Sequence, residues 1–222
     1  MKNKILLATC LLVLRYGFSF GQSYIGIRAG LNSGKFSGDS PRDLVYKGKI
    51  QYNAGVDLDI RLKKDLFLSI SPGYLLSGSK LQYPFEDIEE ETEEYRDSID
   101  LKLYMISLPI YLKIISDNEK YQFSGGFDLG FPTKVLADNS VEEKDLYNEV
   151  NKITVSMVFG LGYRLHIQNS LMLINLGYSQ GLTNLANNFD DSDSYMPRIR
   201  LVTWRLSVAY MLPLGKAKDT SN

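Results

Sequence analysis

A few residues of this 222-residue chain have types and spacing that catalysis could use. His166, the single histidine, is a candidate general base because imidazole titrates near neutral pH. Asp57 and Asp59 stand two residues apart, so in a strand both carboxylates face one side. His166 has no obvious partner nearby in sequence, and we interpret the two aspartates as ion-pair partners of arginines. We therefore predict that the protein is not an enzyme, and we assign it no catalytic residue.

The run from Glu86 to Asp100 (EDIEEETEEYRDSID) is the sharpest local change in composition. Clustered carboxylates can bind Ca²⁺ or Mg²⁺, but the run lacks the spacing of an EF-hand. Such a run usually forms a solvated segment, so we expect weak divalent-cation binding at most. The chain also has no Gly-rich phosphate loop, no Cys/His cluster and no basic nucleic-acid patch. We assign no metal-binding residue, no cofactor-binding residue, no cofactor and no nucleic-acid partner.

The N-terminus has the three parts of a secretory signal peptide. A positive start, Met1-Lys-Asn-Lys, precedes the ten-residue apolar run Ile5–Leu14, and Ser19-Phe-Gly21 offers a cleavage site. We predict a signal peptide at residues 1–21 and one mature domain at residues 22–222. The only cysteine, Cys10, belongs to the signal peptide, so the mature chain is expected to contain no disulfide. No later stretch of about 18 apolar residues predicts a transmembrane helix.

The rest of the chain alternates apolar and polar residues with a period of two, which is typical of strands. The 15 tyrosines and 18 glycines also favour an aromatic-rich β protein. Eight segments show the pattern: 24–31, 52–62, 66–77, 101–114, 121–131, 153–165, 171–182 and 202–212.

The connections between these segments differ in length in a regular way. Those after the second, fourth and sixth segments are short (63–65, 116–120 and 166–170), and the others are long and polar. Short turns at one end and long loops at the other are typical of outer-membrane barrels. We predict an all-β, eight-stranded antiparallel up-and-down transmembrane β-barrel with short periplasmic turns and long outer loops.

One face of the predicted strands is apolar, and the other carries glycines, serines and charges. In a bilayer barrel the apolar row faces lipid, and an eight-stranded interior is just wide enough for side chains to fill. Buried charges must pair, so we predict a plugged, salt-bridged interior. Its charges would be Arg28, Asp57, Asp59, Arg61, Asp128, Arg164 and Arg205.

A soluble, lipocalin-like ligand-binding barrel is the alternative, since period-two patterning alone cannot tell the inside of a barrel from the outside. Such a barrel places its apolar face inward, around a ligand. The glycine-and-charge row, strand lengths near 9–11 residues, tyrosines near the strand ends and the export signal favour the membrane barrel.

Four short motifs carry a resemblance that covers essentially the whole mature chain. They are YIGIRAGLN (24–32), LPIYLK (108–113), YQFSGGFDLG (121–130) and YSQGLTN (178–184). The chain resembles the PorT-like outer-membrane β-barrel proteins of Bacteroidetes. The resemblance implies a non-enzymatic protein of the outer membrane, structural or interacting through its outer loops. One family member is tied to protein secretion, so an accessory role in a secretion system is the alternative.

The expected partners follow from the predicted location. They are outer-membrane lipid and lipopolysaccharide, with other envelope or secretion proteins as further candidates. Liposome swelling would test the filled interior, and secretion by a strain lacking the gene would test the secretion role.

Pro109 falls on the inward row of a predicted strand, where its missing N–H breaks the ladder. A closed barrel has no edge to hide this defect, and an unpaired carbonyl at membrane depth is costly. We predict a β-bulge, or hydrogen-bond partners from the interior or from water. Pro72 of the preceding strand is expected to lie nearby and to share the irregularity.

Overall fold

The computed structural model describes residues 23–39, 45–82, 99–138, 143–187 and 198–214. The predicted signal peptide and nearly all of the acidic run 86–100 lie outside these residues. No helix among the described residues is long and apolar enough to cross a membrane. The elements are β1 (Ser23–Gly38), β2 (Val45–Lys63), β3 (Leu66–Ile70), β4 (Gly73–Gln82), β5 (Ile99–Ile115), β6 (Tyr121–Asp138), β7 (Glu143–Asp145), η1 (Tyr147–Glu149), β8 (Thr154–Ile167), β9 (Ser170–Gly181) and β10 (Ile199–Leu214).

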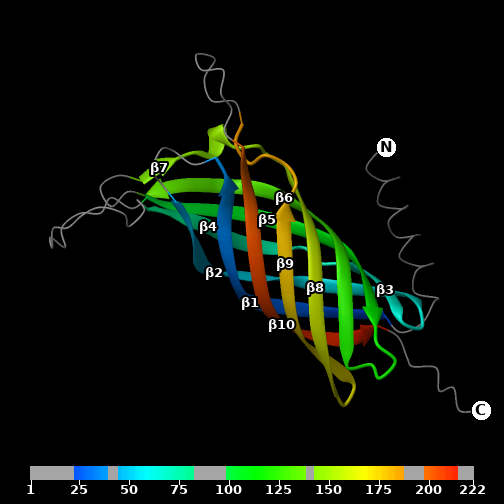
Figure 1. Cartoon of the computed structure of the whole chain (residues 1–222). Coiled ribbons are helices and arrows are strands. Elements are labelled where there is room, and N and C mark those ends of the chain that lie inside the picture. Colours follow the sequence, from blue (N-terminus) through cyan, green and yellow to red (C-terminus); the bar gives the residue numbers. More distant parts are fainter. Residues whose placement is uncertain (1–22, 40–44, 83–98, 139–142, 188–197, 215–222) are drawn as a thin grey trace, which may run out of the picture.

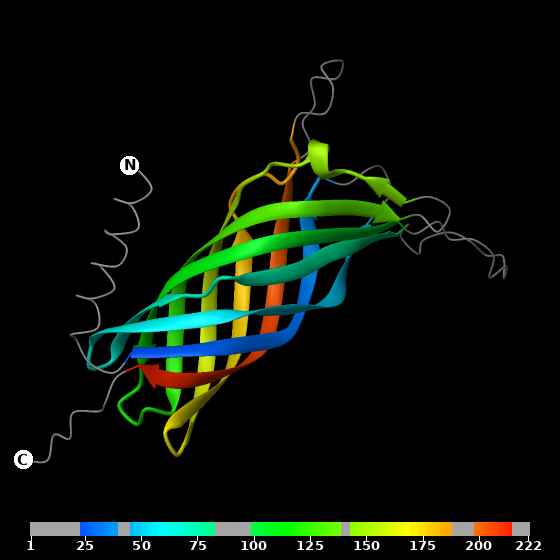
Figure 2. The same ribbon diagram turned by 180° about the vertical axis from the view of Figure 1, so that it is seen from behind.

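The strands close into an antiparallel barrel (Figures 1 and 2). β1 pairs with β2 on one side and with β10 on the other, which joins the two ends of the sheet. β3 and β4 both lie between β2 and β5, so together they form one interrupted strand. β7 pairs with the end of β6. The ring therefore has eight strands, and the predicted fold class is confirmed.

The pairing register fixes how far the strands are staggered. We start at Tyr24 of β1 and step from each residue to its cross-strand partner, once around the ring. This path returns to β1 at Gly34, ten residues after Tyr24. A fixed stagger of this kind requires strands that tilt by about 35–45° from the barrel axis. The path runs through Asp59, Ser69, Tyr111, Gly126, Val158, Ser179 and Thr203.

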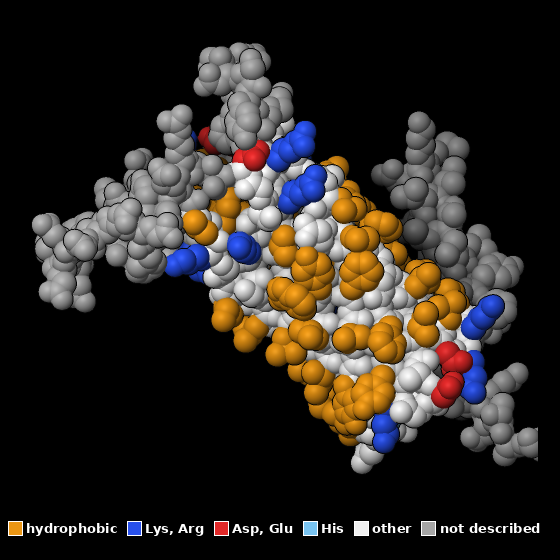
Figure 3. All heavy atoms as spheres, viewed as in Figure 1, with side chains coloured by type: hydrophobic (Ala, Val, Ile, Leu, Met, Phe, Trp, Pro, Cys, Tyr) orange, Lys and Arg blue, Asp and Glu red, His pale blue; other side chains and the backbone are white. Residues whose placement is uncertain are grey.

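Large apolar side chains cover the outside of the barrel. Figure 3 shows them as a band across the middle of the molecule, with Lys and Arg side chains at its ends. This is the surface of a barrel immersed in lipid, so the lipocalin-like alternative, with its apolar face inward, is wrong. Each of the eight strands contributes at least one exposed member: Ile27, Val56, Tyr74, Ile110, Phe127, Phe159, Leu176 and Leu206.

Outward-facing aromatic residues form pairs toward both ends of the band. Near the short turns, the rings of Tyr121 and Tyr163 meet edge to face with their centroids 5.5 Å apart. Toward the long loops, Tyr178 and Trp204 are paired across strands at 4.9 Å. Amphipathic rings of this kind lie at the headgroup level of a membrane. Tyr24 differs from this pattern, because it is buried inside the barrel.

The three short turns lie together at one end, and the long connections lie at the other (Figure 1). Several strands are much longer than the predicted 9–11 residues. β2 has 19 residues and β6 has 18, so both continue beyond the lipid-facing band at the outer end. In β2 the pairing also shifts by one residue within this extra length, which interrupts the apolar periodicity there. β7 and η1 also form in a segment predicted to be loop.

The two prolines share one interruption, as predicted, but without a bulge. The ladder breaks at Ser71-Pro72, between β3 and β4, and the same register resumes on both neighbouring strands. The Ser71 N–H donates to the Pro109 carbonyl at 2.9 Å, and Pro109 has no N–H to return. The Ser71 carbonyl instead accepts a hydrogen bond from Arg28 Nη2 at 3.2 Å. The predicted interior partner is therefore Arg28.

Gly126 lies where an added side chain would meet the backbone of the neighbouring strand β5. A Cβ at Gly126 would stand 2.1 Å from the Ile110 carbonyl oxygen, whereas one at Gly125 would meet the Phe159 ring at 3.8 Å. We expect Gly126→Ala to lower the free energy of unfolding by about 1–3 kcal/mol, because the backbone must shift. The matched control Gly125→Ala is expected to change it by no more than about 0.5 kcal/mol. Urea titration in lipid vesicles measures both, and equal effects would contradict the close approach.

Candidate functional site

Buried ion pairs form the middle layer of the barrel interior. Three inward aspartates, each at most 4% exposed, are paired with a cation from another strand. Because an isolated buried charge is costly, such pairing is what permits charged residues at this depth. The pairs are Arg28–Asp57 at 3.0 Å, Lys113–Asp59 at 2.8 Å and Arg205–Asp128 at 2.7 Å.

Arg28 connects three strands of the wall. Its Nε donates to Asp57, its Nη1 donates to Asn53 at 3.3 Å, and its Nη2 reaches Ser71. Asn53 lies directly next to the irregular part of β2, where the pairing with β4 shifts by one residue. One guanidinium therefore supports β2 and the proline interruption at the same time, as its planar fork of donors allows.

The other two pairs carry further hydrogen bonds. Both Asp59 oxygens accept from Lys113 Nζ, and both Asp128 oxygens accept from the Ser107 hydroxyl. The expectation that arginines pair with both Asp57 and Asp59 is wrong for Asp59, whose partner is a lysine. Lys113 was absent from the predicted interior charges. It occupies the same inward row of β5 as Pro109, and this spacing is the signal from which it could be found.

Two predicted interior charges do not join the ion-pair layer. Arg61 donates to the carbonyls of Lys63 and Lys64, in the turn after its own strand. Arg164 is 5% exposed and lies 5.9 Å from the Tyr24 ring and 5.8 Å from the Phe67 ring. Among the described residues, no carboxylate forms an ion pair with either arginine. The prediction that every inward charge pairs with an opposite charge is therefore wrong near the short-turn end. There, backbone carbonyls and the faces of aromatic rings contact the arginines instead of carboxylates.

Apolar side chains pack inside the barrel at two places, which the predicted polar interior did not include. One cluster contains residues near the short turns, and the other contains residues near the outer loops. The polar ion-pair layer lies between them along the strands. The first cluster is Tyr24, Phe67, Ile115, Leu171, Leu173, Ala209 and Met211, and the second is Phe36, Tyr46, Leu81, Leu103, Val135, Val150 and Leu185.

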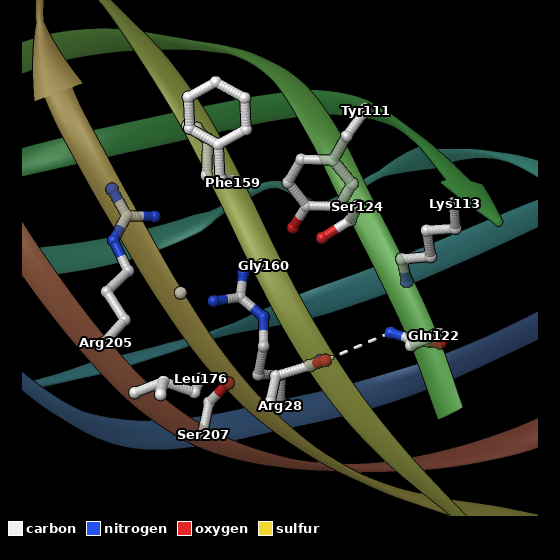
Figure 4. Close-up of a pocket in the computed structure, with 13 residues that line it drawn as sticks. Arg28, Tyr111, Lys113, Gln122, Ser124, Phe159, Gly160, Leu176, Arg205 and Ser207 are labelled. Carbon is white, nitrogen blue, oxygen red and sulfur yellow. Dashed lines mark hydrogen bonds between the residues drawn. The ribbon is translucent and has the colours of Figure 1, made fainter. Parts of the chain in front are cut away.

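A small cavity of about 50 Å³ borders the ion-pair layer. Figure 4 shows the Arg28, Arg205 and Lys113 side chains around it, together with the Tyr111 ring. Gln122 donates to Asn175 at 3.0 Å along one side. Gly160 and Gly177 form part of the wall, and their missing side chains leave the space open. Each cation at the cavity already has an aspartate partner, so the cavity is polar and internally neutralised.

The candidate catalytic residues lie in different parts of the barrel and have different partners. His166 lies at the short-turn end, with Nε2 3.9 Å from a Glu119 carboxylate oxygen of the adjacent turn. Both side chains are exposed, so this is a surface contact, although it does supply His166 with a partner that its neighbouring sequence lacks. Asp57 and Asp59 are committed to ion pairs. Within the described part of the chain, no three His, Cys, Asp or Glu residues are grouped as a metal site.

The outer end of the barrel has its own polar contacts. Burial, and then the neighbouring Asp39, raises the pKa of Tyr46 above its ordinary value. The Tyr46 hydroxyl donates to the Asp39 carbonyl at 3.2 Å. The hydrogen bond to Asp138 raises the pKa of Lys102, and Lys49 forms an ion pair with Asp100. These contacts hold the strand ends together beyond the lipid-facing band.

Several solved structures are similar to this chain. Similar solved structures include Ail, the attachment invasion locus protein of Yersinia pestis (TM-score 0.48, 15% identity, covering 86% of this chain and 99% of that chain). Neisserial surface protein A has a TM-score of 0.47 at 13% identity, covering 85% and 96%. OprG of Pseudomonas aeruginosa has a TM-score of 0.46 at 10% identity, covering 89% and 97%.

Sequence comparison gives the family itself. No curated protein sequence matches the chain. The family described as "Outer membrane protein beta-barrel domain" matches residues 18–187, which is most of the chain. The closed ring of eight strands and the apolar outer band are the structure that this description requires. The chain belongs to the outer membrane protein β-barrel domain family.

Proposed function

We propose that this protein is a non-enzymatic, integral outer-membrane barrel with a filled interior, which acts as a structural and interaction protein through its outer end. The observation that carries the proposal is that the barrel has two parts along its strands: a filled, lipid-facing part and an outer extension. Ion pairs and apolar clusters occupy the interior, and the strands extend past the lipid-facing band. Family membership supports the outer-membrane location, and the motifs of residues 24–32 and 108–113 support a PorT-like member from Bacteroidetes.

The outer extension is suited to contact with partners because it is internally braced. Its apolar cluster contains residues of five strands of the ring, including Phe36 of β1 and Val135 of β6. The rings of Phe36 and Tyr46 meet edge to face at 5.9 Å, which fixes β1 against β2. A rigid support of this kind holds loops in place, as scaffolds do for binding loops in general. Its expected partners are outer-leaflet lipopolysaccharide and envelope proteins.

Solute flux tests the filled interior directly. We expect liposomes that contain the folded protein to swell in an arabinose solution no faster than empty liposomes. The physical reason is that ion pairs and apolar side chains occupy the lumen of an eight-stranded barrel. An open porin, reconstituted at the same protein-to-lipid ratio, is the positive control. Swelling at a rate that rises with the amount of protein would reject the proposal in favour of a transporter.

A further inference from the structure

Basic residues lie near the outer end of the outward face on six consecutive strands of the ring. Each lies toward the outer end of its strand, with Ser33 between Leu31 and Lys35 on β1 and the exposed Val45 beyond Lys47 on β2. All except the half-buried Lys102 are exposed to solvent. In ring order from β10 through β1, β2, β4 and β5 to β6, these residues are Arg200, Lys35, Lys47, Lys80, Lys102 and Lys134, here called the basic rim.

The register places the basic rim on the outward face. Lys35 follows Leu31 by four residues on β1, and Arg200 precedes Trp204 by four residues on β10, so each shares the face of its lipid-exposed neighbour. Lys134 is paired with Tyr104, an outward residue of β5. Lys47 and Lys80 are paired directly across β2 and β4.

Two of the described acids near the rim already form ion pairs with lysines. Asp100 forms an ion pair with Lys49, and Asp138 forms one with Lys102. None of the ion pairs among the described residues includes Lys35, Lys80, Lys134 or Arg200. The rim therefore presents several cations at the height where the lipid-facing surface ends.

The described residues at the other end of the band carry fewer exposed basic side chains. There the exposed lysines among the described residues are Lys63, Lys64 and Lys120, which lie in two of the three short turns. The two ends of the lipid-facing band thus present different numbers of exposed basic side chains to the two surfaces of the membrane. Cations next to an anionic membrane surface each contribute to binding, and the contribution falls with ionic strength.

We propose that the basic rim binds the phosphate groups of the outer-leaflet glycolipid, with the acyl chains of the same molecule lying against the apolar band below. The inference rests on the proposed outer-membrane role and adds the ligand class and the residues. Phosphate oxygens accept several charge-assisted hydrogen bonds, which suits lysine and arginine side chains on neighbouring strands. A glycolipid with two phosphates can contact several of these strands together, whereas a phospholipid offers one phosphate.

The test compares lipid binding by two charge-matched variants. The rim variant carries Lys35→Gln, Lys80→Gln and Arg200→Gln, and the control variant carries Lys63→Gln, Lys64→Gln and Lys120→Gln at the opposite end. Trp204, the only tryptophan, lies on the outward row of β10 near Arg200 and reports binding by its fluorescence. Each folded protein, in zwitterionic detergent with EDTA, is titrated with diphosphoryl lipid A, dephosphorylated lipid A or phosphatidylglycerol. EDTA removes divalent bridges to the acidic run 86–100.

We expect the rim variant to bind diphosphoryl lipid A about tenfold more weakly than the unchanged protein, and the control variant to stay within about twofold. Dephosphorylated lipid A should bind all three proteins equally weakly. Equal affinity of the rim and control variants would overturn the proposal. Phosphatidylglycerol bound as tightly as diphosphoryl lipid A would overturn the glycolipid assignment. Neither result would alter the swelling assay, so failure of this inference is distinguishable from failure of the proposed function.

Discussion

Replacing Arg28 with leucine is expected to lower the free energy of unfolding by about 3–5 kcal/mol, because the Asp57 carboxylate then stays buried without its partner. Urea unfolding in lipid vesicles, followed by Trp204 fluorescence, measures the change. Arg198→Leu, at an exposed position of the outer end, is the matched control and should alter stability by no more than about 0.5 kcal/mol. Equal effects of the two substitutions would mean that the interior pair adds nothing to the stability of the barrel.

The contact between Arg28 and the proline interruption can be separated from the ion pair. Arg28→Lys retains a positive charge beside Asp57 but loses the fork that reaches the Ser71 carbonyl. Pro109→Ala restores an N–H that can donate to the same carbonyl. We expect Arg28→Lys to cost about 1–3 kcal/mol in the unchanged protein and clearly less in the Pro109→Ala background. The same cost in both backgrounds would show that Arg28 does not replace the missing N–H.

Replacing Lys113 with methionine is also expected to cost about 3–5 kcal/mol of unfolding free energy, because both Asp59 oxygens lose their buried donor. A buried ion pair exchanged as a whole for apolar residues is often close to neutral. We therefore expect the double variant with Lys113→Met and Asp59→Leu to be more stable than Lys113→Met alone. The same urea titration measures the full double-mutant cycle. Additive costs of the two single changes would contradict direct coupling between Lys113 and Asp59.

Strand order and loop lengths could be predicted because lipid and lumen impose opposite chemistry on alternate residues. The eight segments, the three short turns and the interior position of Asp57 and Asp128 follow from that alternation. The choice of ion-pair partners does not follow from the alternation. It depends on the stagger of the strands, which determines which charged residues lie at the same depth in the barrel. Asp59 is paired with Lys113, 54 residues away, through this stagger. Nothing in the local sequence near Asp59 encodes the match.

The outer end was less predictable, since irregular pairing changes the face of a side chain. Pairing shifts by one residue between Gly48 and Asn53 of β2, and this turns Tyr46 into the interior. A second shift lies where Tyr104 and Met105 meet β6, and it brings Lys134 to the outward face. A bulge inverts the inside–outside pattern beyond it. The basic rim and the outer apolar cluster therefore emerge only once the register is known.

The seam between β1 and β10 sets the order in which this fold can be completed. All 16 residues of Ser23–Gly38 are paired with Ile199–Leu214. The first strand of the barrel therefore cannot complete its pairing until the last strand is present. A chain that stops before Ile199 would have two open sheet edges, β1 and β9, with free N–H and C=O groups. Such edges are templates for pairing with other chains. Until β10 is in place, β1 is therefore an open edge at which another chain can pair.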